Sequence, residues 1–96
     1  MADIATPPTK IVRRSDDFRY IPCDAVNIAV GIDGIKMMLG VEELDGSVLD
    51  LTGVHLSHKT AMFLKAALTQ GLDLYQTETG IKLDEPDLMP MRPEEE

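Results

Sequence analysis

The fold is decided by residues 26–41, VNIAVGIDGIKMMLGV, in which apolar residues alternate with small or polar ones on both sides of a central turn. Alternation with a period of two is typical of a β-strand with one buried face. Asp33-Gly34 between two such runs is a strong signal for a hairpin, because both loop positions favour residues that tolerate a positive φ. A two-residue Asp33-Gly34 loop pairs Val26 with Val41 and keeps the alternating apolar residues on one face.

A third strand is predicted after a second turn, over residues 48–56. We prefer a three-residue loop, 44–46, with Gly46 in a left-handed conformation, because it pairs Val41 with Leu49 and Leu39 with Leu51. The alternative, a two-residue Asp45-Gly46 loop, sets apolar residues opposite polar ones. Under the preferred loop, three apolar residues of the third strand point to the opposite sheet face: Val48, Val54 and Leu56.

A long helix is predicted next, from about His58 to Thr79. Ser57 is a good N-cap, and Gly80 is well placed to end the helix. At 1.5 Å per residue, a helix of this extent is roughly 33 Å long. The predicted fold class is therefore α+β: a three-stranded antiparallel meander followed by one long C-terminal helix packed on one sheet face.

Both ends of the chain are predicted to be tails. Residues 1–19 contain Pro7-Pro8 and form a flexible N-terminal tail, and residues 82–96 form an acidic, proline-containing C-terminal tail. The βββα domain is assigned to residues 20–81. A domain of this size lies near the lower limit for independent stability, where help from oligomerisation becomes plausible.

The net charge of −8 is unevenly distributed: +1 over residues 1–19, −5 over residues 20–81 and −4 over residues 82–96. An acidic chain repels phosphates, so we expect no direct nucleic-acid binding. No apolar run reaches the ~18 residues that span a bilayer, so we expect no membrane partner. The beginning of the chain lacks the apolar stretch of a secretory signal, and Cys23 is the only cysteine. The expected location is therefore the reducing cytoplasm.

The apolar arc of the predicted helix is wider than one packing face requires. One stripe is expected on the sheet, and it comprises Ala61, Leu64, Leu68, Leu72 and Tyr75. The flank beside it is the candidate interface, and it comprises Phe63, Ala67, Gly71 and Leu74. The alternative is that this flank curls under the tails or caps the sheet edge. Because symmetric dimers are the commonest oligomers, we expect a homodimer that Phe63→Asp or Leu74→Asp dissociates or unfolds.

The C-terminal tail carries a second candidate contact, an apolar patch in an acidic segment. Its residues are Leu88, Met89 and Met91, and such segments dock as extended peptides in a partner's groove. The alternative is a tail without a partner.

No catalytic, metal or cofactor site is predicted. His55, His58 and Cys23 do not form a pattern that brings three or four metal ligands together. Ser57 with a histidine and Asp50 lacks the strained elbow and the glycine-rich oxyanion loop of a nucleophile, and capping accounts for this serine. We therefore expect no cofactor and no enzymatic activity.

Residues 54–68, VHLSHKTAMFLKAAL, running on to Tyr75 and Gly80, resemble a pattern in a family of small uncharacterised bacterial βββα proteins, a domain of unknown function. The spacing from Leu56-Ser57 to Gly71-Leu72 is also similar to small enterobacterial biofilm-regulator proteins. The first resemblance carries no activity, and the second implies a regulatory rather than a catalytic role. No functional residue transfers from either family.

The leading hypothesis is a non-enzymatic, self-associating protein–protein interaction or regulatory module that also binds an unidentified protein. One alternative is an acidic inhibitor or nucleic-acid mimic of the kind that phages use against host defence proteins. That role requires the acids to lie in rows on one face. Another alternative is a small-ligand or metal-binding protein.

Overall fold

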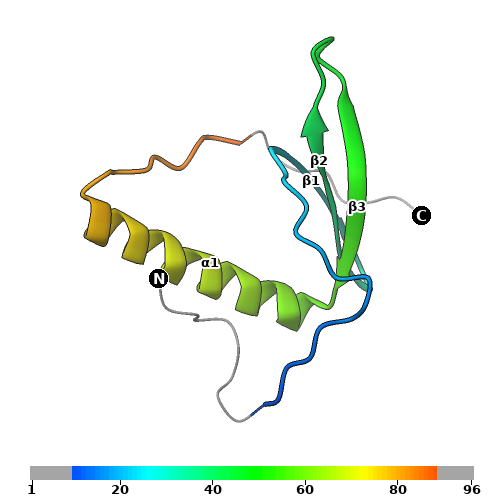
Figure 1. Ribbon diagram of the computed structural model, residues 1–96, viewed down its shortest axis with the longest axis horizontal. Helices are drawn as coiled ribbons and strands as arrows, with labels where there is room; N and C mark the ends of the chain where they lie inside the picture. Colours follow the sequence, from blue (N-terminus) through cyan, green and yellow to red (C-terminus); the bar gives the residue numbers. More distant parts are fainter. Residues whose placement is uncertain (1–9, 89–96) are drawn as a thin grey trace.

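The computed structural model describes residues 10–88 and contains three strands and a helix in that part of the chain: β1 (Ala25–Gly31), β2 (Gly34–Glu42), β3 (Val48–Leu56) and α1 (His58–Thr79). The strands form one antiparallel sheet in the order β1-β2-β3, and α1 contacts β2 and β3 (Figure 1). The predicted α+β fold, a meander followed by one long helix, is confirmed.

The first hairpin differs from the prediction in its turn and register. Gly31 pairs with Gly34, so the loop is Ile32-Asp33, and Val26 pairs with Leu39 rather than with Val41. Ile32 and Asp33 keep negative φ angles, as the central residues of a type I turn do, and Gly34 has a φ of 150°. The glycine thus closes the turn instead of lying inside it. Because the pairing partner moved by two residues, the apolar residues still share a face.

The second hairpin begins as predicted. The backbone N–H of Glu43 donates to the Ser47 carbonyl at 2.7 Å, Gly46 has a φ of 90°, and Val41 pairs with Leu49. The three-residue loop with a left-handed Gly46 is therefore confirmed.

A β-bulge then changes the register between Gly40 and Leu39 of β2. Gly40 pairs with Asp50, but Leu39 pairs with Thr52, so Leu51 is an extra residue on β3 and the predicted pairing of Leu39 with Leu51 is wrong. A one-residue shift exchanges the two faces of the strand that follows.

The bulge places the end of β3 on the face that α1 covers. Val54 pairs with Met37, and Leu56 pairs with Ile35. These residues therefore lie on the same sheet face as the apolar residues of β1 that pair with Met37 and Ile35. The prediction that Val54 and Leu56 point to the opposite face is wrong, because it assumed an uninterrupted ladder. Leu56 is followed directly by Ser57 and the helix, so the bulge also decides which face α1 covers.

The helix has the predicted bounds and caps. The Ser57 hydroxyl accepts a hydrogen bond from the backbone N–H of Thr60 at 3.1 Å. At the other end, Gly80 is left-handed, with a φ of 73°, and its N–H donates to the Gln76 carbonyl. Both ends of α1 are therefore determined by local sequence.

The sheet and α1 bury little apolar surface between them. Among residues 10–88 no hydrophobic side chain is fully buried. The radius of gyration is 15.8 Å, whereas a compact domain of this length has a value of about 12 Å. The apolar faces that the sequence predicts are present on the sheet and on α1, but over much of their area a groove separates one face from the other.

Candidate interaction surface

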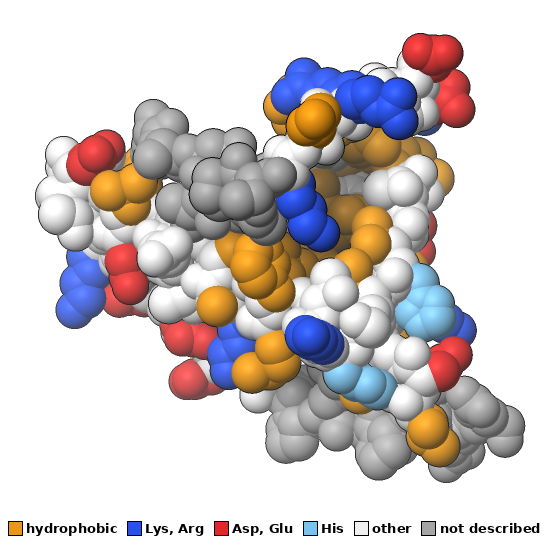
Figure 2. Space-filling view, turned by 90° about the horizontal axis from the view of Figure 1, so that it is seen from below, with side chains coloured by type: hydrophobic (Ala, Val, Ile, Leu, Met, Phe, Trp, Pro, Cys, Tyr) orange, Lys and Arg blue, Asp and Glu red, His pale blue; other side chains and the backbone are white. Residues whose placement is uncertain are grey.

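An apolar groove of about 930 Å³ lies between the sheet and α1. α1 starts beside the end of β3 and runs away from the sheet, and residues 80–88 return toward it (Figure 1). Seen from below, the hollow between helix and sheet is lined with hydrophobic side chains (Figure 2). We call it the apolar groove.

The sheet contributes the floor of the apolar groove. Ile28, Ile35 and Met37 occupy alternate positions of β1 and β2 on one face, and Leu56 joins them from β3. Leu56 reaches this face because of the bulge. The floor is thus a product of strand periodicity and of one inserted residue.

The helix contributes the longest wall. Its groove-lining apolar residues include Met62, Leu68 and Leu72, whose side chains are 64%, 55% and 50% exposed. Partly exposed leucines on a long helix are ordinary one at a time, but these lie beside an apolar sheet floor. Together they form one continuous surface that water reaches.

The third wall is the segment after α1. The backbone N–H of Leu83 donates to the Gln76 side-chain oxygen at 2.7 Å, which holds the returning chain against the last turns of the helix. This segment lines the groove with Leu83, Asp84, Glu85 and Pro86. It belongs to the segment predicted as a tail, and it takes part in the groove.

The charged residues that line the groove are mostly acidic. Asp73 on the helix and Asp84 and Glu85 on the returning segment line it, and Lys65 is the basic lining residue other than His58. These side chains are exposed. The groove therefore combines an apolar lining with an excess of negative charge, a combination that favours an apolar partner carrying basic residues.

At the start of α1, a hydrogen bond links the helix wall of the groove to the sheet. The Nε2 atom of His58 lies 2.9 Å from the carbonyl oxygen of Gly31, at the end of β1. Because a carbonyl only accepts, the imidazole donates this bond. His58 thus connects the first turn of α1 to the first hairpin.

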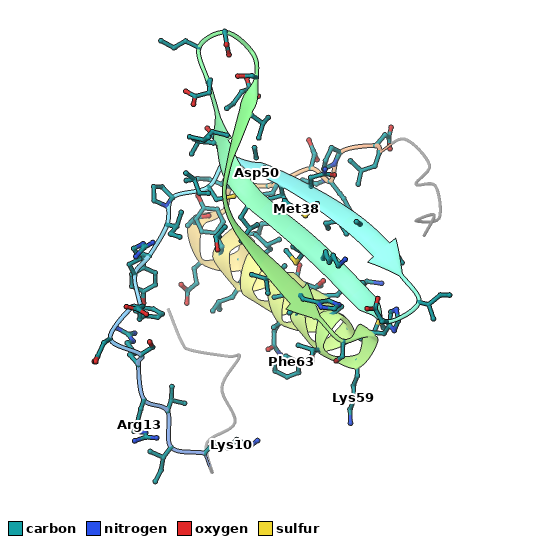
Figure 3. All side chains as sticks on the ribbon, turned by 90° about the vertical axis from the view of Figure 1, so that its right-hand side faces the viewer. Lys10, Arg13, Met38, Asp50, Lys59 and Phe63 are labelled. Atoms are coloured by element: carbon teal, nitrogen blue, oxygen red, sulfur yellow. The ribbon has the colours of Figure 1, made fainter. Side chains whose placement is uncertain are left out.

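The candidate interface residues share one arc of the helix but differ in burial. Ala67, Gly71 and Leu74 are half-buried, together with Ala61, Leu64 and Tyr75 of the stripe expected on the sheet. Phe63 is 53% exposed and projects away from the sheet (Figure 3). The half-buried side of α1 therefore lies between the two predicted stripes, with Phe63 at one edge of the apolar arc.

The sequence did not indicate that the other edge of the apolar arc of α1 is open. Leu68 and Leu72 were expected to pack on the sheet, but they line the open groove. A helical period indicates which residues share a face, but it does not give the angle at which the helix leaves the sheet.

The remaining candidates are widely separated. Leu88 is 83% exposed, and Met89 and Met91 lie outside the described residues. Ser57 is engaged as the N-cap, and its hydroxyl lies 2.9 Å from that of Thr60. Over residues 10–88, no three histidine, cysteine or acidic side chains come together as a metal site.

The helix of the described segment is not long and apolar enough to cross a membrane. Comparison of the chain with protein-family profiles, with curated proteins and with solved structures gives no match.

Proposed function

We propose that this chain is a non-enzymatic protein–protein interaction module that self-associates by burying its apolar groove against a second copy. The observation that carries the proposal is the open groove of about 930 Å³ in a chain whose described residues include no buried hydrophobic side chain. Full burial of one Leu, Ile or Met side chain contributes about 1.5–3 kcal/mol. Covering the groove would therefore supply the stability that a core of this size lacks.

A second copy is the simplest occupant. A twofold dimer uses the same patch on both subunits, so one groove is covered by apolar residues that the chain already presents. The proposed dimer is cytoplasmic, in keeping with a single, exposed cysteine, Cys23. A regulatory role and a further protein partner remain part of the proposal.

The test is the molecular mass in solution, measured by sedimentation velocity across the micromolar range. We expect a mass near twice the 10.6 kDa of the chain. Leu72→Asp puts a charge into the groove and should shift the population toward monomer, because a buried unpaired charge is costly. The matched control is Gln70→Asp, which adds the same charge on the same helix to a residue that does not line the apolar groove. A monomeric wild-type chain would contradict the proposal.

A small apolar ligand is the second candidate, because ligand pockets have volumes of about 300–1,000 Å³ and a mostly apolar lining. The volume of the groove falls in this range. Native mass spectrometry of the protein from its expression host distinguishes the two candidates: an added mass on a monomer favours the ligand, and a dimer without added mass favours self-association. The acidic-inhibitor alternative stays a prediction, tested by salt-sensitive capture of a basic nuclease or defence complex.

A further inference from the structure

The segment before the sheet is the basic part of the described chain. Residues 10–19, which we call the N-terminal arm, carry four basic and two acidic residues, whereas residues 20–81 carry a net charge of −5. Lys10 and Arg13 are exposed and lie on the part of the arm that is remote from the sheet (Figure 3). Between them, Ile11 and Val12 are 94% and 65% exposed. The arm thus presents two apolar side chains flanked by positive charges.

The base of the arm is ordered by its own contacts. The Arg14 guanidinium lies 4.6 Å from the centre of the Phe18 ring and 5.8 Å from that of Tyr20. The two rings meet edge to face at 5.2 Å, and the Phe18 N–H donates to the Ser15 carbonyl at 3.0 Å. Cation–π and aromatic contacts of this kind stabilise the local conformation of the chain. No residue of the arm lines the groove of its own chain.

The arm and the apolar groove are complementary in both charge and polarity. The groove offers an apolar lining with Asp73, Asp84 and Glu85 along it, and the arm offers an apolar pair with Lys10 and Arg13 beside it. Two copies of a chain with a net charge of −8 repel each other at long range. Contact between the basic segment of one copy and the acidic surface of the other offsets that repulsion.

We propose that the N-terminal arm of one copy lies in the apolar groove of a second copy. Ile11 and Val12 contact the apolar lining, and Lys10 and Arg13 reach the acidic residues along the groove. By the twofold axis the exchange is reciprocal, so each copy donates one arm and receives one. This inference rests on the proposed self-association and names the segment that carries it.

The first test measures dimer affinity by sedimentation equilibrium. Lys10→Glu/Arg13→Glu should raise the dimer Kd by about tenfold, because two exposed charge pairs become repulsive. The matched control is Lys36→Glu/Lys59→Glu, which makes the same change in net charge at exposed positions that do not line the groove. Adding Asp84→Lys/Glu85→Lys to the arm variant should restore the affinity. Equal weakening by the control pair, or no rescue, would overturn the arm contact.

The second test is a disulfide between copies, in a Cys23→Ser background. Val12→Cys in one copy and Leu72→Cys in the other should cross-link on oxidation, because a disulfide requires Cα atoms within about 7 Å. Lys59→Cys is the control partner for Val12→Cys and should not cross-link, since Lys59 projects away from the sheet (Figure 3).

The two tests separate the failure of the arm contact from the failure of self-association. A dimer that forms no Val12–Leu72 cross-link and keeps its affinity in the arm variant overturns the arm contact alone. Cross-linking only within a single chain that carries both cysteines also overturns it. A wild-type chain that stays monomeric overturns both the arm contact and the proposed function.

Discussion

At the tip of the second hairpin, Asp45 accepts two hydrogen bonds from Ser47: one from the backbone N–H at 2.9 Å and one from the hydroxyl at 2.6 Å. The hydroxyl and the N–H stabilise the charged carboxylate and lower the pKa of Asp45 below its ordinary value of 3.8. Because the pKa is lower in the folded state, the contribution to stability is present above pH 3.8 and is lost as the pH falls through the folded-state pKa.

Ser47→Ala removes the hydroxyl and leaves the backbone bond. We expect the pKa of Asp45 to rise toward its ordinary value, and the acid-side loss of stability at this turn to become smaller. The measurement is an NMR titration of the Asp45 side-chain carboxyl carbon between pH 2 and 6, the range that brackets ordinary carboxyl groups. Identical titration curves for the wild type and the variant would show that the hydroxyl does not stabilise the carboxylate.

Turn residues could be predicted from sequence to different degrees. Gly46 is the last residue of a three-residue loop, a position that favours a left-handed glycine, and its conformation was predicted correctly. Asp33-Gly34 is compatible with two turns, because a glycine serves equally inside a mirror-image turn and directly after a type I turn. The residue types alone do not decide between them, so the register was wrong by two positions.

At the scale of elements, the bulge at Gly40 has a direct steric reason. A Cβ built on Gly40 would collide with the Leu49 carbonyl and lie 2.9 Å from the Asp50 Cα atom. A glycine inside a strand often marks such a bulge, so Gly40 was the available signal for the feature that the sequence reasoning missed. The hydrophobic pattern of the strands favoured an uninterrupted ladder, and it was given more weight than the glycine.

Gly40→Ala should destabilise the fold by about 1–3 kcal/mol, because the added methyl group has no space and backbone must move. Gly53→Ala is the matched control in the neighbouring strand, where the nearest atom to a Cβ is the Met37 carbonyl oxygen at 3.8 Å. We expect the control to change stability by less than about 1 kcal/mol.

Urea unfolding at one fixed protein concentration measures both variants, since the stability of a self-associating chain depends on concentration. Equal losses for Gly40→Ala and Gly53→Ala would show that close packing at Gly40 is not what keeps the bulge.

At the scale of the whole molecule, the apolar arc of α1 is wider than its contact with the sheet. The middle of the arc is half-buried, Leu72 lies at the groove edge and Phe63 at the opposite edge. The width of the arc was apparent from helical spacing. The position of the open side was not, because it depends on the direction of the helix after Ser57 and on the return of residues 81–86 to Gln76.

The variant Phe63→Asp tests whether the flank predicted from sequence contributes to dimer affinity, as the groove is proposed to do. If the proposed contact between copies extends around α1 to this flank, Phe63→Asp weakens the proposed dimer, because the exposed phenylalanine loses apolar contact when it is replaced by a charge. We expect a smaller effect than that of Leu72→Asp, which lies inside the groove. Leu74→Asp, at a half-buried position, should also lower stability.

Light scattering gives the masses of the three variants, and circular dichroism gives their helix content. A Phe63→Asp protein with unchanged dimer affinity would remove the flank from the interface and leave the groove.

The bulge at Gly40 also determines on which side of the sheet the chain continues after β3. With Leu51 inserted, the last residues of β3 turn toward the face that holds Ile35 and Met37, and the chain enters α1 on that side. Deleting this one residue would restore a continuous ladder and direct Leu56 to the other face. We expect the helix then to start on the opposite side of the same sheet, so one inserted residue selects between two arrangements of the same elements.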